Sequence, residues 1–223
     1  SFWGVCDLGR FEVAIVIPAY NEANTIRQVI RSISDYGVVI VVNDASEDNT
    51  GFVAAKAGAI VINHEVNHGY DKALESGFMR ADELGCEYVV TMDADGQHNP
   101  DIVEVYIQLL NEGAEVVIGT RDKFQRLAEH IFAWVASIKW GILDPLCGMK
   151  AYRIGVYRDL GHFDSYGSVG TELSIFAVKS GMKIAQLPIK TRERVDAPRF
   201  GNRFSSNIRI LLSLWNGWFL KIT

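Results

Sequence analysis

Short apolar runs alternate with stretches of helical length along the first half of the chain. The runs, rich in Val and Ile, are residues 13–17, 38–42, 60–62 and 88–92. After the first run, four apolar residues recur at the spacing of one helix face: Ile26, Val29, Ile30 and Ile33. Residues 48–57 and 71–84 mix polar and apolar positions over lengths that suit helices. Strands that are apolar on both faces are typical of parallel sheets built from strand–helix–strand units. The pattern therefore predicts an α/β domain in which helices flank a Rossmann-like, mostly parallel sheet.

Polar clusters follow three of these runs directly. They are residues 18–22 (PAYNE), 43–50 (NDASEDNT) and 93–98 (DADGQH). In open α/β sheets, ligands bind outside the carboxyl ends of the strands. We therefore expect the three clusters to meet in one site.

The third cluster carries a candidate metal site. Asp93 and Asp95 stand one residue apart, so an extended backbone places both carboxylates on the same side, and Gln97 adds a third oxygen there. Oxygen ligands of this kind suit a hard divalent cation, which can clamp a pyrophosphate. Asp-x-Asp pairs are also common in solvated loops, so the neighbouring motifs decide between the two interpretations.

Composition sets limits on the class of protein. A length of 223 residues with 48% hydrophobic residues suits one α/β domain, alone or with a small appendage. Cys6, Cys86 and Cys147 are odd in number and widely spaced, which fits neither a disulfide framework nor a zinc site and indicates a reducing compartment. Residues 1–12 lack the pattern of a secretory signal, and no apolar run reaches the ~20 residues of a spanning helix. We therefore expect a cytoplasmic location.

The charge is unevenly distributed, although the net charge is only -5. Residues 1–120 carry 6 Lys+Arg against 19 Asp+Glu, whereas residues 121–223 carry 16 against 8. The basic half suits an anionic co-substrate or an anionic membrane surface, and mutual attraction of the two halves is the alternative. A nucleic-acid partner is not expected.

The three clusters, in this order, resemble those of family 2 glycosyltransferases. Within that family, the chain is most similar to the dolichol-phosphate-mannose-synthase-like branch of polyprenyl-phosphate glycosyltransferases, from about Val13 to about Ser206. The resemblance implies a glycosyltransferase A fold, a nucleotide-sugar donor, a Mg²⁺ or Mn²⁺ ion and inversion at the anomeric carbon. The implied metal ligands are Asp93, Asp95 and Gln97.

The resemblance also implies a set of donor-binding residues. They are Pro18, Ala19, Tyr20, Glu22, Asn43, Asp44, Lys72, Asp93 and Ala94. Tyr20 can lie against a base, and Glu22 and Asp44 can accept from base or ribose, although Glu22 also fits a first-turn helix charge. The family usually has Asp at Asn43, and an amide offers fewer acceptors to guanine, so UDP is favoured slightly over GDP. Lys72 either approaches the nucleotide or is a solvated lysine at a helix start.

The second half carries the residues implied at the acceptor. They are Arg121, Arg126, Asp144, Glu172, Arg199 and Arg203. Asp144 lies in a stretch, residues 143–150, that is similar to the branch's Asp-x-x-x-Gly-(aromatic or apolar)-Lys/Arg pattern. By this resemblance it positions the acceptor, binds the metal-linked donor or acts as a base. Arginine forks suit phosphate oxygens. Surface or salt-bridged roles are the alternatives for each Arg, and a buried helix-capping role is the alternative for Glu172.

The chain ends in an apolar segment after a basic stretch. Residues 190–209 hold six Lys+Arg against two acids, and the segment that follows is rich in Trp and Leu. We expect one catalytic domain over 1–206 and a C-terminal helix over 207–223 that contacts the cytoplasmic membrane face peripherally. A core helix or a homo-oligomer interface are the alternatives.

The expected activity is metal-dependent, inverting transfer of a sugar from a UDP- or GDP-sugar to a polyprenyl-phosphate lipid acceptor. A phosphate monoester needs no strong base, because its second pKa of about 6 leaves it largely dianionic at pH 7. The alternative acceptor is a saccharide hydroxyl in surface polysaccharide assembly, which needs Asp144 as a base. A nucleotidyltransferase usually has a basic, glycine-rich first loop, whereas residues 18–22 are acidic. A non-catalytic sugar-nucleotide-binding protein is the third class.

Overall fold

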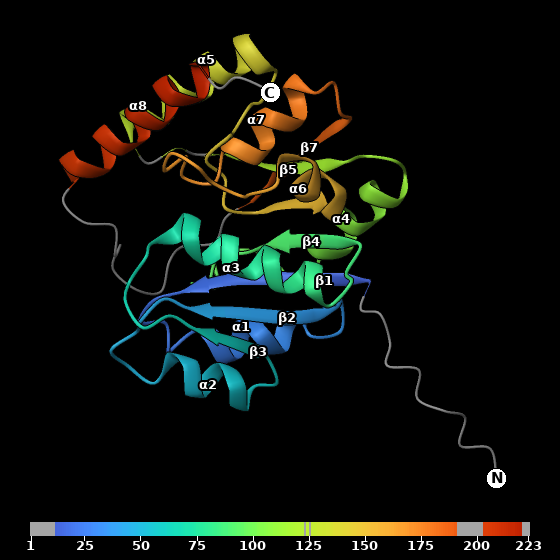
Figure 1. Cartoon of the computed structure of the whole chain (residues 1–223), viewed down its shortest axis with the longest axis vertical. Coiled ribbons are helices and arrows are strands. Elements are labelled where there is room, and N and C mark those ends of the chain that lie inside the picture. Colours follow the sequence, from blue (N-terminus) through green and yellow to red (C-terminus); the bar gives the residue numbers. More distant parts are fainter. Residues whose placement is uncertain (1–11, 123, 125, 191–202, 220–223) are drawn as a thin grey trace.

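The computed structural model describes residues 12–122, 124, 126–190 and 203–219. Its strands are β1 (Val13–Ala19), β2 (Val38–Asn43), β3 (Ile60–Asn63), β4 (Tyr88–Thr91), β5 (Val116–Arg121), β6 (Lys150–Arg153) and β7 (Ile184–Ile189). Its helices are α1 (Ile26–Ile33), α2 (Thr50–Lys56), α3 (Tyr70–Glu83), α4 (Ile102–Asn111), α5 (Leu127–Trp140), α6 (Ile154–Leu160), α7 (Glu172–Lys179) and α8 (Arg203–Phe219). Figure 1 shows the strands as one continuous sheet with helices packed around it.

The seven strands form a single sheet in the order β3-β2-β1-β4-β6-β5-β7. All neighbouring strands are parallel except β6, which runs antiparallel to both β4 and β5. The predicted α/β fold with a mostly parallel sheet is confirmed. Because β1 lies between β2 and β4, the polar clusters that follow these three strands emerge next to one another at the switch point of the sheet.

Both faces of the sheet are buried, which explains the unbroken apolar runs. Along β1, Ala14 and Val16 join the core that packs against α3 and α5, whereas Ile15 and Ile17 join the core that packs against α1 and α4. Successive strand residues point to opposite faces, so burial on both sides leaves no polar alternation.

Helix α8 packs beside α5, as Figure 1 shows at the outer edge of the molecule. The structure begins it at Arg203, earlier than the predicted residue 207, and describes it to Phe219. Ile210 belongs to the hydrophobic core, and the buried hydroxyl of Ser213 donates to the Ser168 carbonyl at 2.7 Å. Its inner face therefore packs as a core helix. None of the helices in the described ranges is long and apolar enough to cross a membrane.

Helix α3 approaches β1 through Gly77. A Cβ atom at this position would stand 2.2 Å from Cγ1 of the buried Val16. We therefore expect Gly77→Ala to lower the free energy of unfolding by about 1–3 kcal/mol, because neither the helix nor the core side chain can give way without strain.

Gly155 is a matched control, since it lies in α6 with open space around the position of a Cβ. Gly155→Ala should leave stability unchanged or raise it by up to about 1 kcal/mol through helix propensity. Urea unfolding measures both changes. Equal stability of the two variants would contradict the close packing of α3 on β1.

Candidate active site

The predicted metal carboxylates lie at the end of β4, where the chain leaves the sheet. Asp95 is buried and accepts a hydrogen bond from the Gln97 backbone amide at 3.0 Å, while the Asp93 side chain is partly exposed. The Asp93 carboxylate lies directly against Gly148, where a Cβ atom would stand 2.4 Å from Oδ2. The loop before β6 thus forms a cradle for this carboxylate.

The oxygen donors of Asp93, Asp95 and Gln97 are of the kind that a hard divalent ion takes. Within the described ranges, no three side chains of His, Cys, Asp or Glu converge as a ready metal cage. Two carboxylates and the Gln97 carboxamide would instead hold Mg²⁺ or Mn²⁺ together with water and substrate phosphates, which is how Mg²⁺ is commonly bound. Such an ion supplies charge neutralisation to a leaving diphosphate.

His98 also contacts a candidate metal carboxylate, that of Asp93. In the sequence analysis it is the last residue of the 93–98 motif and has no assigned role. Its ring is buried, and Nε2 lies 3.3 Å from Oδ2 of Asp93. His98 thus makes a second contact with the Asp93 carboxylate, in addition to that of Gly148.

The loops after β1 and β2 are tied together, as predicted from their positions. The backbone amide of Asn21 donates to the Ser46 hydroxyl at 2.9 Å, and the Asn21 side-chain oxygen accepts from the Glu47 amide at 2.8 Å. Pro18 and Ala19 end β1 beside β2, and the ring of Tyr20 follows at the surface. The first two clusters therefore form one continuous rim.

Glu22 and Asn43 make contacts within this rim. Glu22 is buried, its carboxylate accepts from the Thr25 hydroxyl at 3.0 Å, and its amide donates to the Thr50 hydroxyl at 2.7 Å. The Asn43 amide donates to Asn63 at 2.8 Å. The Asn43 side chain thus contacts another residue of the protein. The preference for UDP over GDP that was inferred from Asn43 stays a prediction.

Asp44 holds the loop that precedes α3. Its buried carboxylate accepts from the backbone amides of His68 at 2.9 Å and Gly69 at 2.7 Å, and it contacts Nδ1 of His64 at 2.7 Å. The sequence predicted a direct contact with the nucleoside. In the structure these oxygens hold the loop at residues 64–69. The contact with the nucleoside stays a prediction.

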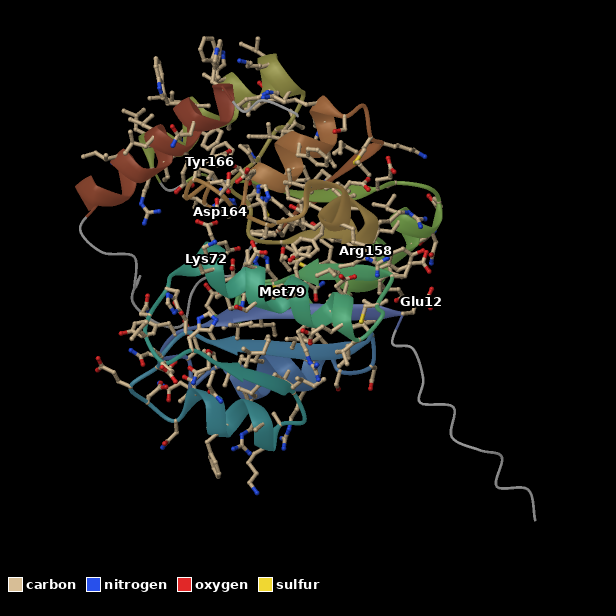
Figure 2. The ribbon with its side chains drawn as sticks, in the orientation of Figure 1. Glu12, Lys72, Met79, Arg158, Asp164 and Tyr166 are labelled. Carbon is tan, nitrogen blue, oxygen red and sulfur yellow. The ribbon has the colours of Figure 1, made fainter. Side chains whose placement is uncertain are left out.

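Lys72 lies in the first turn of α3 and reaches toward the loop before α7. Its ammonium group lies 3.4 Å from the backbone carbonyl of Asp164, and Figure 2 shows the two residues facing each other from α3 and the loop before α7. Because Lys72 is exposed in the first turn of α3, the alternative of a solvated lysine at a helix start is favoured. Lys72 also bridges α3 to the loop of residues 161–171.

The predicted acceptor residues Asp144 and Arg121 form a buried ion pair. Asp144 is only 1% exposed, and it accepts from Arg121 Nε at 2.7 Å, from Nη2 at 2.9 Å and from the Arg121 amide at 3.1 Å. Burial acts to lower the pKa of Arg121, but its hydrogen bonds and attraction to Asp144 outweigh this, so its pKa lies above the ordinary value. The sequence did not assign this pairing.

Glu129, which sequence reasoning missed, joins two of the predicted arginines. Its buried carboxylate lies 3.5 Å from Nη1 of Arg121 and 3.3 Å from Nη1 of Arg126. The carboxylate offsets the repulsion between the two guanidinium groups, and so links Arg121 at the end of β5 to Arg126 at the start of α5. We call Arg121, Arg126, Glu129 and Asp144 the acceptor-side cluster.

Glu172 anchors a loop beneath the surface. It begins α7 and accepts from the Ser165 amide at 2.6 Å, from the Ser165 hydroxyl at 2.7 Å and from His162 at 3.1 Å. This favours the buried alternative over contact with an acceptor. Arg199 lies outside the described residues, and only the backbone of Arg203 is described.

Asp71 and Lys150 hold the same loop from the other side, and neither was predicted as a site residue. Asp71 accepts from the amides of Gly170 at 2.6 Å and Val169 at 3.2 Å, and Lys150 donates to the Gly170 carbonyl. Val169 has a φ of 53°, which a β-branched residue adopts only under strain. Burial lowers the pKa of Lys150 to about 8.

The sequence profile described as "Glycosyl transferase family 2" matches residues 14–133, more than half of the chain. A dolichyl-phosphate hexose transferase from Haloferax volcanii is 32% identical over 196 residues, which cover 82% of this chain and 84% of that protein. A UDP-N-acetylglucosamine–dolichyl-phosphate N-acetylglucosaminyltransferase from Methanococcus voltae is 29% identical over 213 residues, which cover 80% of this chain and 85% of that protein.

A solved structure has the same fold. Glucosyl-3-phosphoglycerate synthase from Mycobacterium tuberculosis, in complex with Mn²⁺ and UDP-glucose, superposes with a TM-score of 0.73. The two proteins are 26% identical, and the match covers 96% of this chain and 84% of the synthase. The glycosyltransferase A fold implied by the motifs is confirmed.

Because Asp71 titrates at a different pH in the folded and unfolded protein, the free energy of unfolding depends on pH. Burial and repulsion from Asp164 raise the pKa of Asp71 from 3.8 to about 6, although hydrogen bonds from Gly170 and Val169 and the charge of Lys150 oppose the rise. The folded protein therefore keeps a proton that the unfolded chain releases. The resulting stabilisation is full below about pH 3.8 and is lost as the pH rises through about 6.

We expect the wild type to lose roughly 2–3 kcal/mol of stability relative to Asp71→Asn between pH 4 and pH 7. The substitution itself also changes the free energy of unfolding, but by the same amount at every pH. This constant cancels, because the prediction concerns only how the difference between the two proteins changes with pH. Urea unfolding of both proteins across this range measures it. A difference that does not vary with pH would contradict the raised pKa.

Proposed function

The chain belongs to glycosyl transferase family 2, and from this membership we propose that it transfers a sugar from a UDP-sugar to a polyprenyl-phosphate lipid with inversion. One observation carries the proposal. The loop of residues 143–149 contacts the metal carboxylate Asp93 through Gly148 and the guanidinium of Arg121 through Asp144. A candidate site for a donor diphosphate thus adjoins the acceptor-side cluster, in which Arg121 and Arg126 are paired with Asp144 and Glu129.

The donor side is supported by its oxygen ligands and by the relatives. Asp93, Asp95 and Gln97 would hold Mg²⁺ or Mn²⁺ against the two phosphates. The Methanococcus voltae relative is named for a UDP-sugar, and the mycobacterial structure at 26% identity contains Mn²⁺ with UDP-glucose. We infer a UDP-sugar in preference to a GDP-sugar on these grounds.

The acceptor side favours a phosphate over a hydroxyl. A saccharide hydroxyl needs a base, and Asp144, the candidate, is buried and accepts three hydrogen bonds from Arg121. A phosphate monoester is already largely dianionic at pH 7 and needs cations in place of a base. The candidate cations are Arg121 and Arg126, which Asp144 and Glu129 hold side by side. The two relatives are named for dolichyl phosphate, which is a polyprenyl-type phosphate.

Inversion follows from a single displacement, in which the acceptor oxygen bonds to the anomeric carbon as the bond to the diphosphate breaks. This chemistry needs the acceptor and the leaving group on opposite sides of the sugar. The metal carboxylates and the acceptor-side cluster lie at opposite ends of the 143–149 loop, which supports that arrangement.

A lipid acceptor requires a contact with the membrane, and we propose the outer faces of α5 and α8 for it. The exposed apolar residues here are Leu127, Ile131, Trp134, Ile138, Ile208, Leu211, Leu212, Trp215 and Trp218. Lys139 lies between the helices, with its ammonium group 3.1 Å from the centre of the Trp218 ring. Tryptophan beside lysine suits the headgroup region of an anionic bilayer. The contact would be peripheral and on the cytoplasmic face.

Membrane contact is tested by substitutions that leave the core intact. Trp134 and Trp215 are 67% and 65% exposed, so Trp134→Ser with Trp215→Ser should weaken binding to vesicles of anionic phospholipid about tenfold or more, through lost apolar burial. Phe52→Ser is the matched control, because Phe52 is 64% exposed on α2. Vesicle flotation measures the bound fraction. Equal binding of the double variant and the control would rule out this face.

The acceptor is tested by substitutions in the acceptor-side cluster. With a polyprenyl-phosphate acceptor, Arg121→Gln should lower kcat/KM about 100-fold or more, because a cation that faces the phosphate is lost. Asp144→Asn should cost less, because the amide oxygen still accepts from Arg121. Initial rates of transfer into lipid measure both.

Arg158→Gln is the control, since Arg158 pairs with Asp82 at the surface of α6 and should not affect transfer. If Asp144→Asn abolishes turnover with donor binding retained, while Arg121→Gln is tolerated, the saccharide-hydroxyl acceptor is correct instead.

A further inference from the structure

We propose that Gly148 and His98 are positioning residues that fix the Asp93 carboxylate for the metal from two sides. The inference rests on the proposed function, because it concerns the metal that would bind the donor diphosphate. It assigns these two residues a part in metal affinity although neither is a ligand.

Gly148 restricts the carboxylate by steric contact. A Cβ atom at this position would lie 2.4 Å from Oδ2, 2.7 Å from Oδ1 and 2.8 Å from Cγ of Asp93. All three distances are shorter than van der Waals contact, so the carboxylate rests directly on the Gly148 backbone. Any larger residue must displace the carboxylate or the loop.

The loop at Gly148 has little freedom to retreat. The hydroxyl of Thr91, which is buried at the end of β4, donates to the Gly148 carbonyl at 2.7 Å and accepts from the Lys150 amide at 3.1 Å. The flanking side chains of Cys147 and Met149 are buried in the core. The displacement forced by a larger residue therefore falls on Asp93.

His98 holds the carboxylate by a hydrogen bond. An ionised carboxylate only accepts, so Nε2 of His98 carries the proton and donates to Oδ2 of Asp93. The other ring nitrogen, Nδ1, is buried and has no hydrogen-bond partner among the described residues. Burying an imidazole with one unpaired nitrogen costs free energy. The contact with Asp93 is the hydrogen bond through which His98 acts on the site.

These two contacts act on the metal because ligand geometry decides its affinity. Groups that orient a metal ligand from behind typically change metal affinity 10- to 100-fold when they are removed. Gly148 and His98 together select one position of the carboxylate before the ion arrives. A ligand that is already positioned loses less freedom on binding.

The test is a titration of Mn²⁺ in the presence of UDP, in which electron paramagnetic resonance measures the free ion. Gly148→Ala and His98→Leu should weaken Mn²⁺ binding about 10- to 100-fold. His98→Gln, whose amide nitrogen reaches the position of Nε2, should stay within about threefold of the wild type. Gly155→Ala is the matched control for an added methyl group, because its site is open.

Each outcome decides a separate point. Weak binding in Gly148→Ala and His98→Leu, with recovery in His98→Gln and unchanged thermal unfolding midpoints, supports the inference. Wild-type affinity in both Gly148→Ala and His98→Leu overturns it while leaving the proposed function intact. Failure of the wild type to bind Mn²⁺ with UDP, and equally with GDP, overturns the proposed donor site itself.

Discussion

The site depends on the strand β6, which lies antiparallel between β4 and β5. Residues 143–149 lead into this strand, and they contact the groups that end both neighbours: Arg121 at the end of β5 and Asp93 just beyond β4. Hydrogen bonds of the sheet hold all three strands, so the separation between the candidate metal ligand Asp93 and the acceptor-side cluster is set by the core. Sites built on regular elements keep their geometry better than sites on free loops.

Buried charges around this frame hold the irregular segments in place. Asp44, Asp71 and Glu172 each accept from backbone amides, and Lys150 donates to a backbone carbonyl. Burying a charge is costly unless it is paired and hydrogen-bonded, and these groups satisfy that condition by binding loop backbone. The loop that contains the strained Val169 persists because it is held in this way. These loops are therefore held by contacts within the protein itself.

Sequence reasoning succeeded where local pattern determines structure. The apolar runs predicted the strands, and the clusters at their ends predicted which loops meet, because parallel strands share one carboxyl edge. The family followed from the order of the motifs.

Side-chain partners far apart in the sequence were not predictable. The Asp144 pairing with Arg121 spans 23 residues and the Asp71 contact with Gly170 spans 99, and no local pattern encodes either. The contacts of Glu172 with Ser165 and of Lys72 with Asp164 were missed for this reason, since each partner lies in a loop whose path is set by tertiary packing. Helix α8 has apolar residues on both faces, so its composition could not separate the core side from the exposed side.

The most direct measurement is the product of transfer. Purified protein is incubated with a labelled UDP-sugar panel, with and without Mn²⁺, and with polyprenyl phosphate or a saccharide acceptor; the lipid fraction is then counted and the product anomer determined by NMR. The account predicts label in lipid only when Mn²⁺ and polyprenyl phosphate are both present, with the anomeric configuration inverted. Metal-independent transfer, a retained configuration, or label on the saccharide alone would contradict it.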